Sequence, residues 1–128
     1  MWIKYNANPV ANRVEDCAIR AVAVALDITW DEAFDQIAEM AKSMGAVMHQ
    51  NAAFGAVLRK HGFRRYIIPN TCPDCYTIAD FVDDHPIGTF IIATGSHVVT
   101  AQDGNYFDTY DSGSLVPSYY FALKEDKA

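Results

Sequence analysis

The sequence predicts an α+β fold, in which N-terminal helices pack on a C-terminal antiparallel sheet. The spacing of apolar residues leads to this prediction, because it is helical up to about residue 62 and mostly strand-like afterwards. The chain has 128 residues, of which 51% are hydrophobic and 20% are charged. A chain of this length and composition is expected to form one globular domain, spanning residues 1–128, with a single core.

Three helices are expected in the first half of the chain. The first begins at Cys17, with Asp16 as its N-cap, and its small apolar side chains suit close packing in the middle of the domain. The second follows Thr29, which can form a capping box with Glu32. Glycines end the second and third helices. The expected helical ranges are 17–27, 29–45 and 51–62.

The second half of the chain is expected to form strands, with one short helix between Thr77 and Pro86. Asp103-Gly104 is a dipeptide favoured in tight β-hairpin turns, and it separates two of the expected strands. An order of helices first and strands second is typical of an α+β plan. The expected strand ranges are 63–68, 89–93, 97–102, 106–111 and 118–123.

Charge and hydropathy exclude several classes of partner. The net charge is −6 and the ten Lys and Arg residues are scattered, so we expect no nucleic-acid partner. No apolar run approaches the roughly 20 residues needed to cross a bilayer, and the first residues do not resemble a secretory signal peptide. The chain has three cysteines, an odd number, so no disulfide framework is expected. The sequence therefore predicts a cytoplasmic protein with reduced thiols and no membrane partner.

Cys17 and His97 are the leading candidates for chemistry. The partial positive charge at a helix N-terminus stabilises a thiolate, and Cys17 lies in the first turn of its helix. His97 follows the flexible pair Gly95-Ser96 at the start of a strand, where an imidazole can act as base to a neighbouring thiol. The alternatives are a buried core cysteine and a strand-edge histidine, neither with a chemical role. His85, in a polar turn, is expected to face solvent.

An acidic residue is needed to orient the imidazole of His97, and two candidates follow it in the sequence, Asp108 and Asp111. A hairpin centred on Gly104 places Asp111 opposite His97. A two-residue turn formed by Asp103-Gly104 instead places Asp108 on the same face as His97. The first register is preferred, so Asp111 is the favoured third residue and Asp108 is the alternative.

Three short motifs resemble the papain-like cysteine peptidase superfamily. They are Asp16-Cys17 at a helix start, Gly95-Ser96-His97-Val98-Val99 and Tyr110-Asp111-Ser112. From about Asn6 to Tyr120, the chain also resembles small uncharacterised proteins of bacteriophages and prophages. The resemblance implies a papain-like core and a phage-encoded thiol protease or amidase. Such a hydrolase forms an acyl-enzyme on its cysteine, acts on a peptide or protein substrate and needs no cofactor.

One feature departs from the papain-like pattern. These enzymes carry a Gln about six residues before the nucleophile, which helps to stabilise the oxyanion, and here Ala11 occupies that position. Asn12 or Asn8 is expected to supply the amide instead, together with the Cys17 backbone N–H. The absent Gln also favours a second function. In it, the protein is a non-catalytic papain-like binding module that serves as a phage accessory, virion or host-factor-inhibiting protein.

Metal sites are not expected. Cys72 and Cys75 have the spacing of half a zinc site, but no second pair of ligands follows, and a polar turn with two thiols is the simpler interpretation. The acidic residues between positions 80 and 84 are interpreted as the solvated face of a short helix. The sequence leaves the substrate and the oligomeric state open.

Overall fold

The computed structural model describes residues 1–10, 15–48 and 51–124. In these ranges the helices are α1 (Cys17–Leu26), α2 (Trp30–Met44), α3 (Asn51–Lys60) and α4 (Ile78–Asp84). The strands are β1 (Trp2–Lys4), β2 (Phe63–Ile67), β3 (Thr89–Ala93), β4 (Val98–Gln102), β5 (Asn105–Asp108) and β6 (Tyr119–Leu123). Most helices precede most strands, so the predicted α+β class is confirmed. No helix in the described ranges has the length and apolar character that crossing a bilayer requires.

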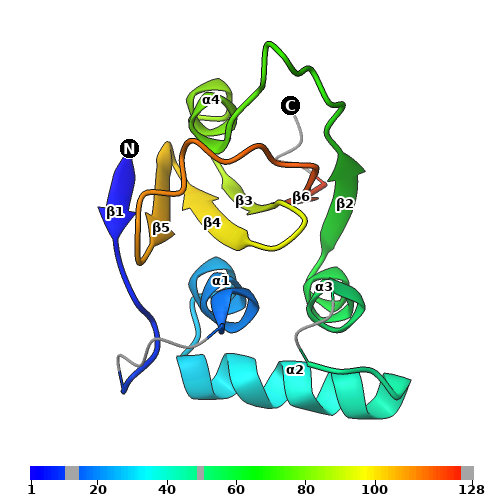
Figure 1. The fold of residues 1–128 in the computed structure, drawn as a ribbon. Helices are drawn as coiled ribbons and strands as arrows, with labels where there is room; N and C mark the ends of the chain where they lie inside the picture. The colour runs from blue at the N-terminus through cyan, green and yellow to red at the C-terminus, as the bar shows by residue number, and fades with distance from the viewer. Residues whose placement is uncertain (11–14, 49–50, 125–128) are drawn as a thin grey trace.

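The strands form one six-stranded sheet in the order β1-β5-β4-β3-β6-β2. Neighbouring strands are antiparallel except β1 and β5, which are parallel, so the sheet is mixed rather than wholly antiparallel as expected. Strand β1 has only three residues, too few for an alternating pattern to be recognised in the sequence. Figure 1 shows it at one edge of the sheet, beside β5.

Helices cover both faces of the sheet (Figure 1). On one face α1 and α3 lie against the strands and α2 packs across both of them, whereas α4 lies on the opposite face. Strand β3 is therefore buried on both sides. Ile91 and Ala93 belong to the core on the α1 side, and Phe90 and Ile92 belong to the core on the α4 side. This double burial explains why β3 is an almost unbroken apolar run in the sequence.

Helix α1 is held on strand β4 by packing and by two hydrogen bonds. Small buried side chains such as Ala21 let the helix approach the sheet closely. The Thr100 hydroxyl of β4 donates to the Ala21 carbonyl at 2.6 Å, and the Gln102 side-chain amide donates to the Val24 carbonyl at 3.3 Å. These contacts place the N-terminus of α1, with Cys17, beside the start of β4.

The turn between β4 and β5 decides which acidic residue lies at the start of β4. Asp103 and Gly104 have φ angles of 49° and 85°, both in the left-handed region, as a two-residue type I′ turn requires. Gln102 accordingly pairs with Asn105 across this turn. The observed register is therefore the two-residue alternative, and the register centred on Gly104, which favoured Asp111, is wrong.

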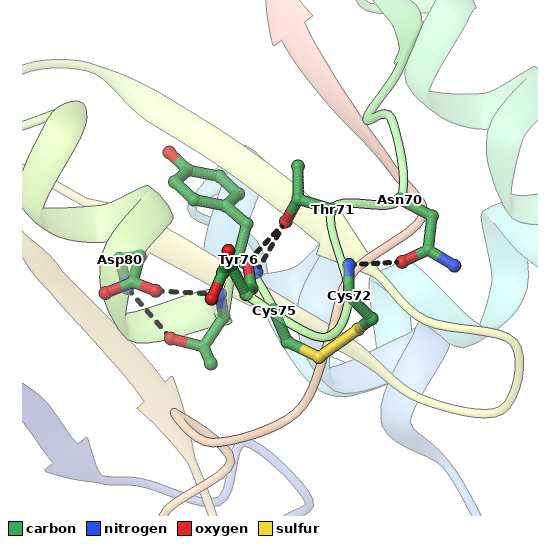
Figure 2. Close-up of a disulfide and its surroundings, with 8 residues drawn as sticks. Asn70, Thr71, Cys72, Cys75, Tyr76 and Asp80 are labelled. Atoms are coloured by element: carbon green, nitrogen blue, oxygen red, sulfur yellow. Dashed lines mark hydrogen bonds between the residues drawn. A yellow bond between two sulfur atoms is a disulfide. The ribbon is translucent and has the colours of Figure 1, made fainter.

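Cys72 and Cys75 form a disulfide in the loop between β2 and α4 (Figure 2). Their Cα atoms are 4.1 Å apart, in a turn where the Thr71 hydroxyl accepts a hydrogen bond from the Tyr76 backbone N–H at 3.1 Å. The expectation that all three thiols are reduced is wrong for this pair, because the turn brings the two side chains together. Cys17 remains as the free cysteine.

Thr100→Val is expected to lower the free energy of unfolding by about 1 kcal/mol, because it removes the buried hydroxyl that anchors α1 to β4 while nearly conserving volume. Urea unfolding followed by circular dichroism measures the difference. Thr89→Val is the matched control, since Thr89 lies at the partly exposed start of β3. An equal loss in both variants, or no loss in Thr100→Val, contradicts the anchoring role.

Candidate active site

Three side chains from three segments meet at one end of the sheet. Cys17 is the first residue of α1, His97 immediately precedes β4, and Asp108 is the last residue of β5. The Nε2 atom of His97 lies 2.6 Å from Oδ2 of Asp108. The Cys17 thiol lies near enough to the His97 imidazole for each group to shift the pKa of the other. Because Asp108 occupies Nε2, Nδ1 is the imidazole nitrogen left for another partner, and the three groups form one electrostatically coupled cluster.

The ionisation of Cys17 is coupled to that of His97. Burial alone would raise the pKa of the Cys17 thiol, but hydrogen bonds from His97 and from the Val98 backbone N–H outweigh it. The positive charges of His97 and Arg20 add to this effect, so the pKa of the thiol lies below its ordinary value. Burial would lower the pKa of His97, but its hydrogen bonds to Asp108 and Cys17 raise it to about 9. The arrangement therefore favours a thiolate beside an imidazolium.

Asp108 is held as a charged carboxylate although only 1% of it is exposed. Burial would raise its pKa, but hydrogen bonds from His97 and Ser112 keep the pKa below its ordinary value. The Ser112 hydroxyl donates to Oδ2 at 2.7 Å, and the Thr109 backbone N–H donates to Oδ1 at 2.8 Å. The Arg20 guanidinium also donates to Oδ1, at 3.2 Å. Both oxygens are thus engaged, which fixes the orientation of the carboxylate that holds His97.

Arg20 joins Asp108 to a second buried carboxylate, that of Asp16. Its Nε donates to Oδ1 of Asp16 at 2.8 Å while its Nη1 reaches Asp108. The other oxygen of Asp16 accepts hydrogen bonds from the Trp30 indole at 2.9 Å and from the Asn8 amide at 3.2 Å. Asp16 occupies the N-cap position of α1, as predicted, but its side chain makes no capping hydrogen bond. It supports the candidate site instead, through Arg20.

Sequence reasoning preferred Asp111 as the acidic partner of His97, whereas the structure brings His97 together with Asp108. Asp111 is exposed, and it accepts a hydrogen bond from the Tyr106 hydroxyl rather than from His97. The physical reason is the length of the turn, because a two-residue turn places the end of β5, with Asp108, beside the start of β4.

The remaining sequence candidates lie away from the thiol or outside the described residues. The Asn8 side chain is engaged at both ends, by Asp16 and by the Val10 backbone N–H, so it is not directed at Cys17. Asn12 lies outside the described residues. His85, expected to face solvent, is half-buried and stacks on Phe81 with ring centroids 3.9 Å apart. No group of three or more His, Cys, Asp or Glu in the described part of the chain is placed to hold a metal ion.

Two supporting residues, Arg20 and Ser112, were missed by sequence reasoning. Arg20 follows Asp16 by four positions, the spacing at which opposite charges pair on one helix face, so a local signal for that contact was present. The contact between Arg20 and Asp108 has no such signal, because 88 positions separate them. Ser112 reaches Asp108 only because of the path of the chain after β5.

Asp108→Asn is expected to move the onset of Cys17 alkylation by iodoacetamide to a higher pH. The neutral amide no longer raises the pKa of His97, so the thiolate loses its imidazolium partner. Peptide mass spectrometry over a pH series measures the onset. The matched control is Asp111→Asn, which removes the same charge from an exposed carboxylate bound to Tyr106 and is expected to change nothing. A larger shift in Asp111→Asn contradicts the assignment of Asp108.

Arg20→Met is expected to lower the free energy of unfolding by about 3 kcal/mol, because it leaves two buried carboxylates without their cation. Arg20→Lys keeps the positive charge, but an ammonium group is not a planar fork that can contact both carboxylates. An intermediate decrease in the free energy of unfolding is therefore expected. Urea unfolding measures both differences. Arg59→Met is the control, because Arg59 lies at the exposed end of α3. A decrease in unfolding free energy as large as that of Arg20→Met would contradict the bridging role of Arg20.

Comparisons with known proteins do not place the chain in a family. No protein-family model matches it, and no curated protein or solved structure matches it either. The functional interpretation rests on the geometry of Cys17, His97 and Asp108.

Proposed function

We propose that the protein is a papain-like cysteine hydrolase, a peptidase or an amidase. Cys17 is the nucleophile, His97 is the base and acid, and Asp108 orients His97. The observation that carries the proposal is the hydrogen bond between His97 and the buried Asp108 carboxylate, next to a thiol whose pKa His97 lowers. The position of Cys17 at the start of α1 supports it, because the helix dipole favours a thiolate there.

The steps of the reaction follow from these charges. The Cys17 thiolate attacks the carbonyl carbon and forms a tetrahedral intermediate with its negative charge on oxygen. As the intermediate collapses, the His97 imidazolium gives its Nδ1 proton to the leaving amine, and the acyl group stays on sulfur as a thioester. The imidazole then takes a proton from water, whose oxygen attacks the thioester and releases the carboxylic acid. Asp108 remains ionised and stabilises the imidazolium.

A peptide or protein is the substrate class that we propose. Tyr110 offers an aromatic surface for a substrate side chain, because it is 48% exposed and its ring centroid lies 5.2 Å from that of His97. The net charge of −6 disfavours anionic polymers such as nucleic acids. The Cys72–Cys75 disulfide argues against a reducing compartment, since disulfides are rare in cytosolic proteins.

A non-catalytic binding module is the alternative, and one observation favours it. No Gln precedes Cys17 in the chain, and losing one oxyanion donor typically costs on the order of 10²–10³ in rate. In this case the hydrogen bonds of His97 and Asp108 serve only to stabilise the fold. The two functions differ in the reactivity that they predict for the thiol.

Alkylation of Cys17 by iodoacetamide, followed by peptide mass spectrometry between about pH 4 and 10, separates the two functions. Wild-type Cys17 is expected to react rapidly well below the ordinary thiol pKa of 9.0, because the thiolate is paired with an imidazolium. His97→Ala is expected to return the onset to the ordinary range. His61→Ala is the control, since His61 is exposed and contacts Gln36.

The proposed hydrolase is abandoned if wild-type Cys17 reacts only near its ordinary pKa, or if His97→Ala leaves its reactivity unchanged. Either result would favour the non-catalytic binding module. A shift in His61→Ala equal to that in His97→Ala would show that the effect is not specific to the candidate site.

A further inference from the structure

The Tyr119 hydroxyl is buried without a hydrogen-bond partner. Tyr119 is the first residue of β6 and is 5% exposed. Within the described residues, its hydroxyl is the sole buried side-chain oxygen or nitrogen that makes no hydrogen bond. Burying a hydroxyl without a partner is unfavourable, and such groups in native proteins call for a specific explanation. One explanation is a ligand atom that accepts the hydrogen bond when it is bound.

The same phenol lies on the Cys17 side of the sheet. Tyr119 pairs with Ala93 of β3, and Ala93 pairs with Val98 of β4, so the three residues form one row across the sheet. Val98 directly follows His97 in the chain. Tyr119 and Val98 belong to one side-chain cluster, and Cys17 packs against it. The row therefore joins Tyr119 to the residue next to His97.

The ionisation of Tyr119 is consistent with this position. Burial raises the pKa of the phenol, and the Arg65 guanidinium, stacked 4.4 Å from the ring centroid, lowers it. The negative charge of Cys17 also raises the pKa of the phenol. The net effect is a raised pKa, so the hydroxyl keeps its proton at neutral pH. The Tyr119 hydroxyl is thus a hydrogen-bond donor whose pKa is affected by the Cys17 charge. It donates to no protein group in the described ranges.

We propose that the Tyr119 hydroxyl donates a hydrogen bond to the oxyanion that forms when Cys17 attacks a carbonyl carbon. The inference rests on the proposed function and names a donor for a part of the site that lacks the usual Gln. The Asn8 side chain is hydrogen-bonded at both ends, to Asp16 and to the Val10 backbone N–H, whereas the Tyr119 hydroxyl has no hydrogen-bond partner among the described residues. The hydrogen bond forms only in the tetrahedral state, so the phenol acts on acyl transfer and not on the nucleophilicity of the thiolate.

Two reagents that use the same thiolate separate these effects. Iodoacetamide alkylates Cys17 by forming a sulfur–carbon bond with loss of iodide, and no oxyanion arises. With p-nitrophenyl acetate, the thiolate adds to the ester carbonyl to give an oxyanion, and collapse expels p-nitrophenolate and leaves an acetyl group on Cys17. Tyr119→Phe is expected to leave the alkylation rate unchanged and to slow acetylation on the order of 10²-fold. The released p-nitrophenolate and the mass of the Cys17 peptide report acetylation.

Tyr120→Phe is the matched control, because Tyr120 is the next residue of β6 and faces the α4 core on the other side of the sheet. It is expected to change neither rate. Thermal unfolding of Tyr119→Phe is expected at the wild-type midpoint or above it, since the substitution removes a hydroxyl that makes no hydrogen bond.

The outcomes distinguish the two proposals. Equal acetylation in Tyr119→Phe and wild type overturns the role of Tyr119 and leaves the Cys17–His97 chemistry intact. A parallel loss of alkylation and acetylation, or a lowered unfolding midpoint, shows a structural role and also overturns it. Slow alkylation of wild-type Cys17 that does not depend on His97 overturns the hydrolase and, with it, the oxyanion donor.

Discussion

The buried carboxylate of Asp108 is the point on which the candidate site depends, because it joins segments that are far apart in the chain. It accepts hydrogen bonds from His97 before β4, from Ser112 in the loop after β5, and from Arg20 of α1. A carboxylate with this little exposure is driven towards its neutral form unless such donors surround it. The charge that they stabilise raises the pKa of His97, and the His97 charge lowers the pKa of Cys17. The thiolate therefore depends on contacts that the thiol itself does not make.

Stability and reactivity are coupled through helix α1. The helix carries Cys17 in its first turn and Arg20 one turn later, so a movement of α1 displaces the nucleophile and the support of Asp108 together. Its position is held by the Thr100 hydroxyl on one side and by Asp16, which Trp30 of α2 contacts, on the other. A buried ion pair of this kind contributes little net stability compared with apolar packing, but it defines one geometry. We interpret the network of Asp16, Arg20 and Asp108 as one that fixes the position of the thiol.

The surroundings of the thiol differ on its two sides. On the Asp108 side, the side chains of His97, Ser112 and Arg20 are hydrogen-bonded to the carboxylate, which fixes the orientation of the imidazole. Towards β6 the thiol packs against an apolar cluster that contains the unpaired hydroxyl of Tyr119. A polar group without a partner lowers stability in the free protein, and functional sites are where such unfavourable features are retained. This asymmetry is the one expected if Tyr119 is the oxyanion donor of the proposed hydrolase.

The sequence by itself determined the features that depend on neighbours in the chain. These include the capping boxes that begin α2 and α4, the left-handed Gly45 that ends α2, and the start of α1 at Cys17. It also placed His97 at the start of a strand. Tertiary structure alone decided between Asp108 and Asp111, because a turn longer or shorter by one residue changes which side chains face each other. Tertiary structure alone also placed the short strand β1, Ser112 and Tyr119. Their contacts join segments that are far apart in the sequence, and no periodic pattern in the sequence predicts such contacts.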